Sequence, residues 1–308
     1  MDIAVLIPCY NEATTIKKVI LDFKRVLPEA LIYVYDNNSD DGSDILAEEA
    51  GAIVVHEYKQ GKGNVVRSMF REIDADCYVI VDGDDTYPAE SVSTMVQLIQ
   101  TREADMVIGD RLSSTYFTEN KRPFHNMGNR LVRSLINHLF RSDIMDIMTG
   151  YRAFSRDFVK AFPVTCQGFE IETEMTVFAL DNQLRIKEIP VLYRDRPENS
   201  ESKINTYRDG ARVIRSIVCL FKDVRPLAFF SIVSFFLLSI CLVPFTFILL
   251  DYLHTGFVEK FPTLIVLSAM GVCAIINFFC GVILSVLKKQ HRQNVERFMT
   301  MNHRYRNQ

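Results

Sequence analysis

The first third of the chain alternates short apolar runs with longer amphipathic segments. Apolar runs of this length are typical of buried strands, whereas apolar positions three and four residues apart indicate helices with one buried face. Strands and helices that alternate along a chain predict a parallel sheet covered by helices on both faces. The predicted strands are residues 3–7, 31–36, 52–55, 77–82 and 105–108, and the predicted helices are residues 14–26, 43–50, 62–73 and 89–102.

The last third of the chain has a different pattern. Residues 227–250 and 261–287 are 24 and 27 residues long and contain no charged residue. A helix needs about 20 residues to cross the hydrocarbon core of a bilayer, so each segment predicts a membrane-spanning helix. The alternative is a pair of buried helices in a large soluble core, although such helices rarely run this long without a charge.

The residues that flank these segments predict their orientation. Lys222 and Arg225 precede the first segment and Lys288 and Lys289 follow the second, which places both chain ends in the cytosol by the positive-inside rule. Residues 206–226 combine apolar and basic positions at helical spacing, as an interfacial amphipathic helix does; a basic helix packed on its own domain is the alternative. The predicted organisation is a cytosolic domain over residues 1–205, this helix, a transmembrane hairpin over residues 227–287 and a basic cytosolic tail over residues 288–308.

Composition excludes several classes of protein. The formal charge is −3, so binding nucleic acid through phosphates is not the expected role. The seven cysteines are odd in number and form no CxxC pair, which argues against a disulfide framework or a thiolate zinc site. The first apolar run is too short for a secretory signal, so the N-terminal part is expected to stay in the cytosol.

Acidic clusters follow three of the predicted strands, at residues 8–12, 36–42 and 82–85. The carboxyl ends of parallel strands share one edge of a sheet, where ligands bind. Several carboxylates at one edge suit a hard cation such as Mg²⁺ or Mn²⁺, which adds substrate phosphates to its shell. The glycine-rich motifs of ATPases and of dinucleotide-binding enzymes are absent, so a nucleoside diphosphate held through a metal is the expected ligand.

Four motifs in order along the chain, at residues 7–12, 36–42, 61–63 and 81–85, resemble family 2 glycosyltransferases of the GT-A fold, which has a Rossmann-like, mostly parallel sheet. The later motifs are similar to the branch of dolichyl-phosphate mannose synthase and bacterial polyprenyl-phosphate glycosyltransferases, whose bacterial members also carry membrane helices. The motifs are residues 7–12 (IPCYNE), 36–42 (DNNSDDG), 61–63 (GKG), 81–85 (VDGDD), 109–111 (GDR), 149–154 (TGYRAF), 168–174 (GFEIETE) and 202–205 (SKIN).

The resemblance implies a role for individual residues. Asp84 would ligate the metal directly, and Asp82 would lie near the ribose or the waters of the metal. The synthases have glutamine where this chain has Thr86, so the third protein ligand is not assigned. The nucleotide-sugar pocket would include Pro8, Tyr10, Glu12, Asp36 and Lys62, with Asp36 facing the base, and the lipid phosphate or the donor diphosphate would contact Arg111, Arg196 and Lys203.

The implied reaction is metal-dependent, inverting transfer of a sugar from UDP-glucose or UDP-N-acetylglucosamine to undecaprenyl phosphate at the cytosolic face of the cell membrane, for cell-envelope glycans. An alternative acceptor is a saccharide or glycolipid hydroxyl, which needs a base such as Glu172 or Glu174. An inactive membrane scaffold that binds a nucleotide sugar is an alternative from another class. Contacts between copies of the chain through Ala269, Gly271, Ala274 and Gly281 are a further expectation.

Several of these polar residues also have a structural explanation. Asp40 and Asp41 are favoured as turn and helix-cap residues. Arg152 and Glu174 are as readily explained by pairing with neighbours. His56 has no metal-like spacing with other histidines, so a surface or packing role is expected for it.

Overall fold

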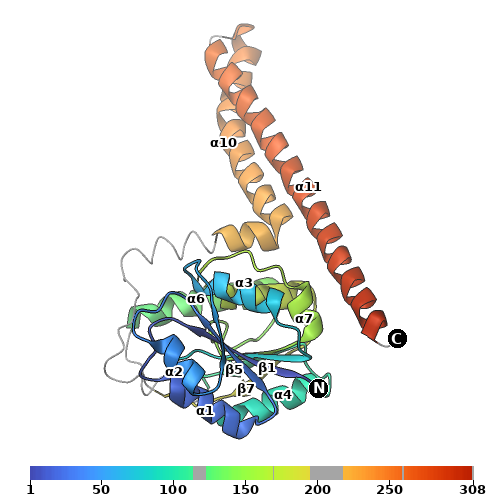
Figure 1. Cartoon of the computed structure of the whole chain (residues 1–308). Helices are drawn as coiled ribbons and strands as arrows, with labels where there is room; N and C mark the ends of the chain where they lie inside the picture. The colour runs from blue at the N-terminus through green and yellow to red at the C-terminus, as the bar shows by residue number, and fades with distance from the viewer. Residues whose placement is uncertain (114–122, 169, 195–217, 259, 307–308) are drawn as a thin grey trace. The chain divides into compact units, whose positions relative to one another are not determined.

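The computed structural model describes residues 1–113, 123–168, 170–194, 218–258 and 260–306. Two compact units divide the chain: Met1–Thr206 with Val295–Gln308 form one, and Tyr207–Asn294 form the other. The first unit contains a seven-stranded sheet and the second contains two long apolar helices (Figure 1).

The sheet has the strand order β3-β2-β1-β4-β6-β5-β7, and every strand except β6 runs in the same direction. The carboxyl ends of β1, β2, β4 and β5 therefore meet at one edge, and antiparallel β6 begins at that edge. The strands are β1 (Ile3–Cys9), β2 (Leu31–Asp36), β3 (Ile53–His56), β4 (Cys77–Ile80), β5 (Met106–Asp110), β6 (Arg152–Ser155) and β7 (Ile186–Pro190).

Helices cover both faces of the sheet, with α1, α2 and α4 on one face and α3, α6 and α7 on the other (Figure 1). Apolar side chains from β1, β2 and β4 fill the space beneath them, and Val5, Ile7 and Val79 are fully buried. The helices of this unit are α1 (Ile16–Val26), α2 (Ser43–Glu49), α3 (Lys62–Glu72), the 3-10 turn η1 (Ala89–Ser91), α4 (Val92–Gln100), α6 (Pro123–Phe140), α7 (Arg156–Ala161) and α8 (Ile171–Asp181).

The predicted α/β architecture is confirmed, and the predicted strands and helices of the first 112 residues are all present with ends shifted by a few residues. The segment predicted as one helix over residues 89–102 is divided into η1 and α4. The antiparallel strand β6 was not predicted. It is four residues long and begins with an arginine, so its sequence has none of the apolar continuity expected of a central strand.

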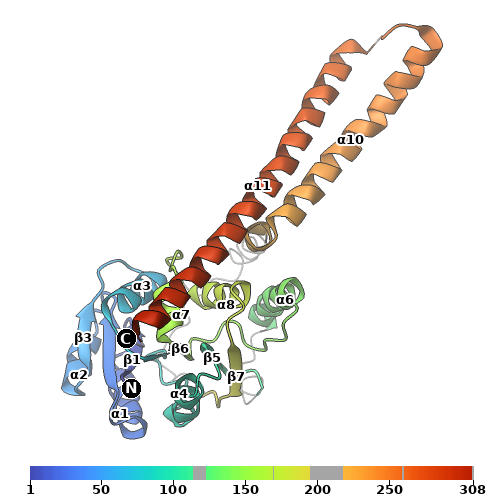
Figure 2. The same cartoon turned by 90° about the vertical axis from the view of Figure 1, so that its right-hand side faces the viewer.

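The second unit is a helical hairpin of α10 (Pro226–Thr255) and the part of α11 (Phe261–Arg306) up to Asn294, and the two helices lie side by side in both views (Figures 1 and 2). Both helices are long and apolar enough to cross a membrane, and 17% and 11% of the residues in their most apolar windows are buried. This exposure contradicts the alternative of core helices in a soluble domain. Helix α11 continues through residues 288–306, which had been predicted only as a basic tail.

Polar and small residues join the two helices. The Asn277 side-chain amide donates to Ser234 Oγ at 2.9 Å and to the Phe230 carbonyl at 3.2 Å. A Cβ on Gly281 would lie 2.6 Å from Phe230 Cβ, so the helices approach closely here because residue 281 is glycine. Residues 218–224 are helical, whereas most of the predicted amphipathic helix over residues 206–226 lies outside the described residues.

Candidate active site

The loops after β1 and β2 form one hydrogen-bonded unit at the carboxyl edge of the sheet. Ser39 Oγ accepts from the Asn11 amide at 2.9 Å, and Ser43 Oγ accepts from the Glu12 amide at 2.8 Å. Asp41 accepts from the backbone amides of Ala13 and Ser43, and its pKa is lowered because these bonds, with one from the Ser43 hydroxyl, outweigh the effect of partial burial. Gly42 is the N-cap of α2 and no side chain caps this helix, so the capping role predicted for Asp40 and Asp41 is wrong. Asp41 instead closes a turn onto Ser43, and Asp40 contributes its backbone amide, which donates to Asn11 Oδ1.

Asp36 ends β2 and is 3% exposed. Its Oδ2 atom accepts from the Ser39 amide at 3.1 Å and lies 3.5 Å from His56 Nδ1. Its Oδ1 atom is buried and has no hydrogen-bond partner among the described residues. A buried carboxylate oxygen without a partner is costly, so this atom is suited to accept an N–H group from a ligand.

His56 lies at the surface, as expected, with its side chain 46% exposed, and it is also placed beside Asp36. The register of the parallel pair β2 and β3 sets Asp36 opposite His56. The imidazole also stacks on Tyr58, with ring centroids 6.5 Å apart. The signal in the sequence was the position of His56 at the end of the next strand, because adjacent parallel strands end at the same edge.

The GKG segment begins α3 and packs closely against the chain before α8. The Gly63 amide donates to the Gln167 carbonyl at 3.1 Å, and a Cβ on Gly61 or Gly63 would overlap the backbone of residues 166 and 167. Asn37 holds the other side of this segment, because its side chain accepts from the Gly61 amide at 2.7 Å and donates to the carbonyls of Glu57 and Lys59. The two glycines therefore permit a contact that positions Lys62.

Lys62 lies between two carboxylates. Its Nζ atom is 2.6 Å from Asp82 Oδ1 and 2.6 Å from Glu172 Oε1, and its side chain is 10% exposed. Burial alone would lower the pKa of Lys62, but Asp82 and Glu172 together raise it above the ordinary value for lysine. The predicted site residues Lys62 and Asp82 are thus brought together, and Glu172 at the start of α8 joins them.

Asp84 is 3% exposed, and its carboxylate turns toward Thr86. Asp84 Oδ1 accepts from the Thr86 hydroxyl at 2.6 Å and from the Thr86 amide at 3.2 Å. The next residue, Asp85, has a positive φ of 58° and pairs with Lys18 and Arg194. The Arg194 amide also donates to the Thr86 carbonyl at 3.0 Å, so the chain beyond β7 runs past the turn that carries Asp84.

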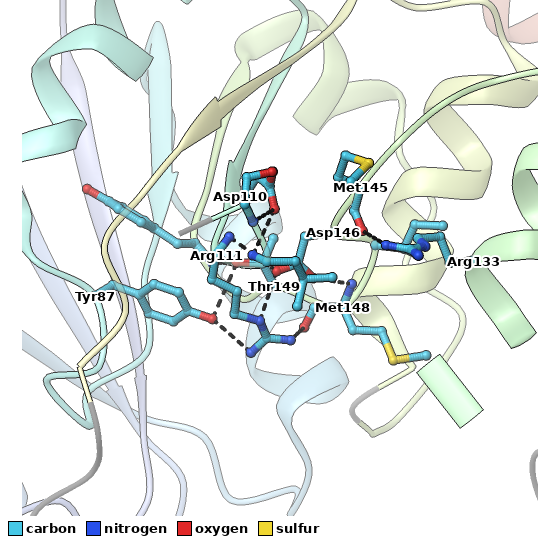
Figure 3. Close-up of polar contacts among 12 residues, drawn as sticks. Tyr87, Asp110, Arg111, Arg133, Met145, Asp146, Met148 and Thr149 are labelled. Carbon is cyan, nitrogen blue, oxygen red and sulfur yellow. Dashed lines mark hydrogen bonds and ion pairs between the residues drawn. The ribbon is translucent and has the colours of Figure 1, made fainter. Parts of the chain in front are cut away.

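Arg111 follows β5, and Figure 3 shows Tyr87, Asp146 and Met148 around it. Its Nε atom donates to Asp146 Oδ2 at 2.8 Å, and its two terminal nitrogens lie 3.3 Å from the Tyr87 hydroxyl and the Met148 carbonyl. The guanidinium carbon is 5.9 Å from the centre of the Tyr193 ring, a cation–π contact. Asp146, Tyr87 and Met148 were not identified from the sequence, because nothing in their spacing relates them to Arg111.

Of the remaining predicted site residues, some lie at the carboxyl edge of the sheet and others lie outside the described residues. Pro8 lies within β1, and Tyr10 is exposed in the loop that follows. Arg196 and Lys203 lie outside the described residues. No group of three His, Cys, Asp or Glu side chains is arranged to hold a metal ion in the part of the chain that the structure describes. The assignment of Asp84 and Asp82 to a metal stays a prediction.

Two relatives from Haloferax volcanii match most of the chain. Glycosyltransferase AglJ is 36% identical over 234 residues, which are 76% of this chain and 76% of AglJ. A dolichyl-phosphate hexose transferase is 30% identical over 226 residues, which are 73% of this chain and 96% of that protein.

A solved structure shares the fold. Glucosyl-3-phosphoglycerate synthase from Mycobacterium tuberculosis, in complex with Mn²⁺, uridine diphosphate and glucosyl-3-phosphoglycerate, aligns with a TM-score of 0.57 and 20% identity, covering 72% of this chain and 79% of that one. At this identity the likeness concerns the fold. The model of glycosyl transferase family 2 matches residues 4–162, just over half of the chain. With AglJ similar over three quarters of both chains, this match shows that the protein is a glycosyltransferase of glycosyl transferase family 2.

Proposed function

We propose that the chain transfers a sugar from a nucleotide sugar to the phosphate of a polyprenyl phosphate, with inversion at the anomeric carbon. The observation that carries this proposal is that Glu172 and Glu174, the two candidate general bases, both have other partners. Glu172 forms an ion pair with Lys62, and the Glu174 carboxylate accepts from the backbone amides of Thr165 and Cys166. Both carboxylates have structural contacts, which disfavours a hydroxyl acceptor that must be deprotonated.

A phosphate acceptor removes the need for a base. The second pKa of a phosphate monoester is about 6, so at neutral pH the nucleophile is largely a dianion. One of its oxygens forms a bond to the anomeric carbon while the bond from that carbon to the diphosphate breaks, and the diphosphate leaves with the electron pair. The name of the dolichyl-phosphate hexose transferase from Haloferax volcanii describes an acceptor of this class. Undecaprenyl phosphate is the narrower proposal for this chain.

On the donor side, Asp36 is the proposed partner of the base. Its buried Oδ1 atom can accept the imide N–H of uracil or an N–H of guanine. The proposed donor is UDP-glucose or UDP-N-acetylglucosamine, in a pocket that includes Pro8, Tyr10 and Glu12. Lys62 acts there through Asp82, because its ammonium group orients that carboxylate.

Asp82 and Asp84 suit a divalent cation that is shared with the donor. Mg²⁺ and Mn²⁺ prefer carboxylate oxygens and retain sites for water and substrate phosphates, so two protein carboxylates are a sufficient donor set. Asp84 is the proposed direct ligand, because Lys62 already holds Asp82. The cation would neutralise charge on the departing diphosphate. Arg111, Arg196 and Lys203 are the proposed contacts of the acceptor phosphate.

The two apolar helices provide the proposed membrane attachment. A polyprenyl phosphate keeps its phosphate at the bilayer surface, so a site tethered to the membrane meets the acceptor there. Lys222, Lys288 and Lys289 flank the apolar segments, which supports cytosolic chain ends and a domain at the cytosolic face of the cell membrane. Self-association through the helices stays a prediction. Two of the four small residues proposed for it have roles within the hairpin, since Gly281 packs against Phe230 and Ala274 is fully buried.

The test is sugar transfer from radiolabelled UDP- and GDP-sugars into organic-extractable lipid, with purified full-length protein, undecaprenyl phosphate and Mn²⁺ or Mg²⁺. One donor should label the lipid, and Asp84→Ala should reduce the rate by about 10²–10³-fold or more. Asp40→Ala is the matched control, because Asp40 is an exposed carboxylate of the same edge whose side chain holds no part of the proposed site; it should keep the wild-type rate. Donor consumption without lipid labelling would favour a hydroxyl acceptor, and full activity of Asp84→Ala would refute the proposed site.

A further inference from the structure

The loop of residues 146–150 touches both halves of the proposed site. At its first residue, Asp146 pairs with Arg111, and the Met148 carbonyl accepts a second bond from the same guanidinium (Figure 3). At its last residue, Gly150 lies against Asp82, and a Cβ at this position would overlap the Asp82 carboxylate. Arg111 follows β5 and Asp82 follows β4, and the start of β6 separates these two strands in the sheet.

A buried arginine holds the loop. Arg152 is fully buried at the start of β6, and it donates to the Ile147 carbonyl at 2.5 Å, the Thr149 carbonyl at 3.0 Å and Thr176 Oγ1 in α8 at 2.8 Å. Burial lowers the pKa of Arg152 to about 10, so the side chain remains charged at neutral pH. A charged group with backbone carbonyls as acceptors fixes the path of the backbone that carries them.

The side chain of Asp146 is committed to the same network. Asp146 is 2% exposed, and its Oδ2 atom also lies 3.4 Å from the backbone nitrogen of Arg111. Tyr87 adds a second connection, because its hydroxyl lies 3.3 Å from both Arg111 and Thr149 Oγ1. The Arg111 side chain is 14% exposed, so these contacts orient a cation that still reaches the surface of the site.

We propose that the loop of residues 146–150 is a positioning element that sets Arg111 of the acceptor side at a fixed place relative to Asp82 of the donor side. Asp146 is the positioning residue for Arg111, and Gly150 leaves the space that the Asp82 carboxylate occupies. This proposal rests on the proposed function, which assigns Arg111 to the acceptor and Asp82 to the donor. It predicts that damage at the two ends of one short loop affects two different substrates.

Two substitutions separate the ends of the loop. Asp146→Asn keeps the size of the side chain and removes its charge, so it should raise the KM for polyprenyl phosphate about tenfold and leave the KM for the donor unchanged. Gly150→Ala displaces Asp82, so it should raise the KM for the donor and weaken UDP-sugar binding about tenfold while the KM for the acceptor stays the same. Asp143→Asn, an exposed carboxylate of the same segment, is the control and should match the wild type.

A second readout needs no transfer activity. Phenylglyoxal modifies accessible arginines, and mass spectrometry of the Arg111 peptide measures the rate for that side chain. Asp146→Asn should accelerate modification of Arg111 several-fold, whereas Gly150→Ala and Asp143→Asn should not. If Asp146→Asn does not fold, Tyr87→Phe releases a different bond to Arg111 and should also accelerate its modification.

Three outcomes are distinguishable. If wild-type protein labels no lipid, the proposed function fails, and the modification rates together with calorimetric UDP-sugar affinities still decide the role of the loop. If both variants raise both KM values equally and lower the thermal midpoint alike, the loop has a merely structural role and the proposal is overturned. Unchanged Arg111 modification in both Asp146→Asn and Tyr87→Phe would overturn it as well.

Discussion

The two units of this chain place charge and apolar surface in opposite ways. The sheet domain buries charged side chains at the carboxyl edge of its sheet, among them Lys62, Arg152 and Glu172. The helical hairpin buries few side chains and exposes large apolar ones, with Phe235 and Phe236 at 73% and 65% exposure. The first unit is suited to water, because its buried charges are paired. The second unit exposes apolar side chains and is therefore suited to an apolar environment. The burial of charge that stabilises the sheet domain therefore does not explain the stability of the hairpin.

The largest expected effect concerns the buried charges of the domain. Lys62→Met leaves Asp82 and Glu172 side by side without their shared cation, and breaking a buried pair in this way costs about 3–5 kcal/mol. Urea unfolding of the detergent-solubilised chain, followed through tyrosine circular dichroism, measures this loss. Lys17→Met is the control, because Lys17 forms an exposed pair with Glu49 that contributes at most about 1 kcal/mol. Equal unfolding midpoints for the two variants would contradict the proposed importance of the buried pair.

Thiol labelling compares the two kinds of burial directly. Burial raises the pKa of both Cys9 and Cys77 to about 12, so at pH 8 their thiolate fraction is about 10³-fold below that of an ordinary thiol. A charged maleimide should therefore label neither of them until urea is added. Cys273 and Cys280 are exposed on α11, yet in membranes they should resist the charged reagent and react with an apolar one. Labelling of Cys273 by the charged reagent in intact membranes would show that this part of the helix lies in water.

A single charge introduced on the hairpin should disfavour membrane insertion only if lipid surrounds the hairpin. Leu238 lies near the middle of α10 and is 43% exposed, and lysine at the centre of a span costs about 2.5–3.5 kcal/mol on insertion. Leu238→Lys should lower the fraction of chain recovered in membranes. Leu21→Lys on α1, where Leu21 is 50% exposed, is the matched control and should leave recovery unchanged. An equally small loss of membrane recovery for both variants would contradict a lipid environment for the hairpin.

The smallest expected effect tests the polar contact inside the hairpin. Asn277→Leu removes the bonds to Ser234 and Phe230, and hydrogen bonds of this kind between membrane helices contribute about 0.6 kcal/mol on average. Unfolding of the hairpin in an SDS titration should shift by this amount. Ser268→Ala is the comparison, since among the residues that the structure describes Ser268 Oγ bonds only the Leu264 carbonyl of its own helix. A shift no larger than that of the control would show that packing alone joins the helices.

Local patterns predicted much of this molecule. The strands and helices of the first 112 residues follow from their apolar periodicity, and the two apolar helices follow from length and lack of charge. Strand-end positions also placed Asp36, Asp82 and Asp84 at the same edge of the sheet. These features share one property, because each depends on residues close together in the sequence or on the general rule for parallel sheets.

The features that were missed depend on distant contacts. Arg111 and Asp146 are 35 residues apart, and no spacing rule connects them. Arg152 was considered as a residue that pairs with neighbours, yet its main acceptors are backbone carbonyls, which no sequence pattern displays. Gly150 matters because it lacks a side chain next to Asp82, and only a folded structure shows what a Cβ would meet.

The position of β6 within the sheet has a consequence for synthesis of the protein. Strands β1 to β4 are complete once Ile80 has been made, but the neighbour of β4 is β6, which begins at Arg152. At about 5–20 residues per second, the intervening stretch of about 70 residues takes roughly 4–14 s to translate. During this interval the edge of β4 has no partner strand, and unpaired edges invite association with other chains. The edge of β4 is therefore open to association with other chains until residues 152–155 have been made.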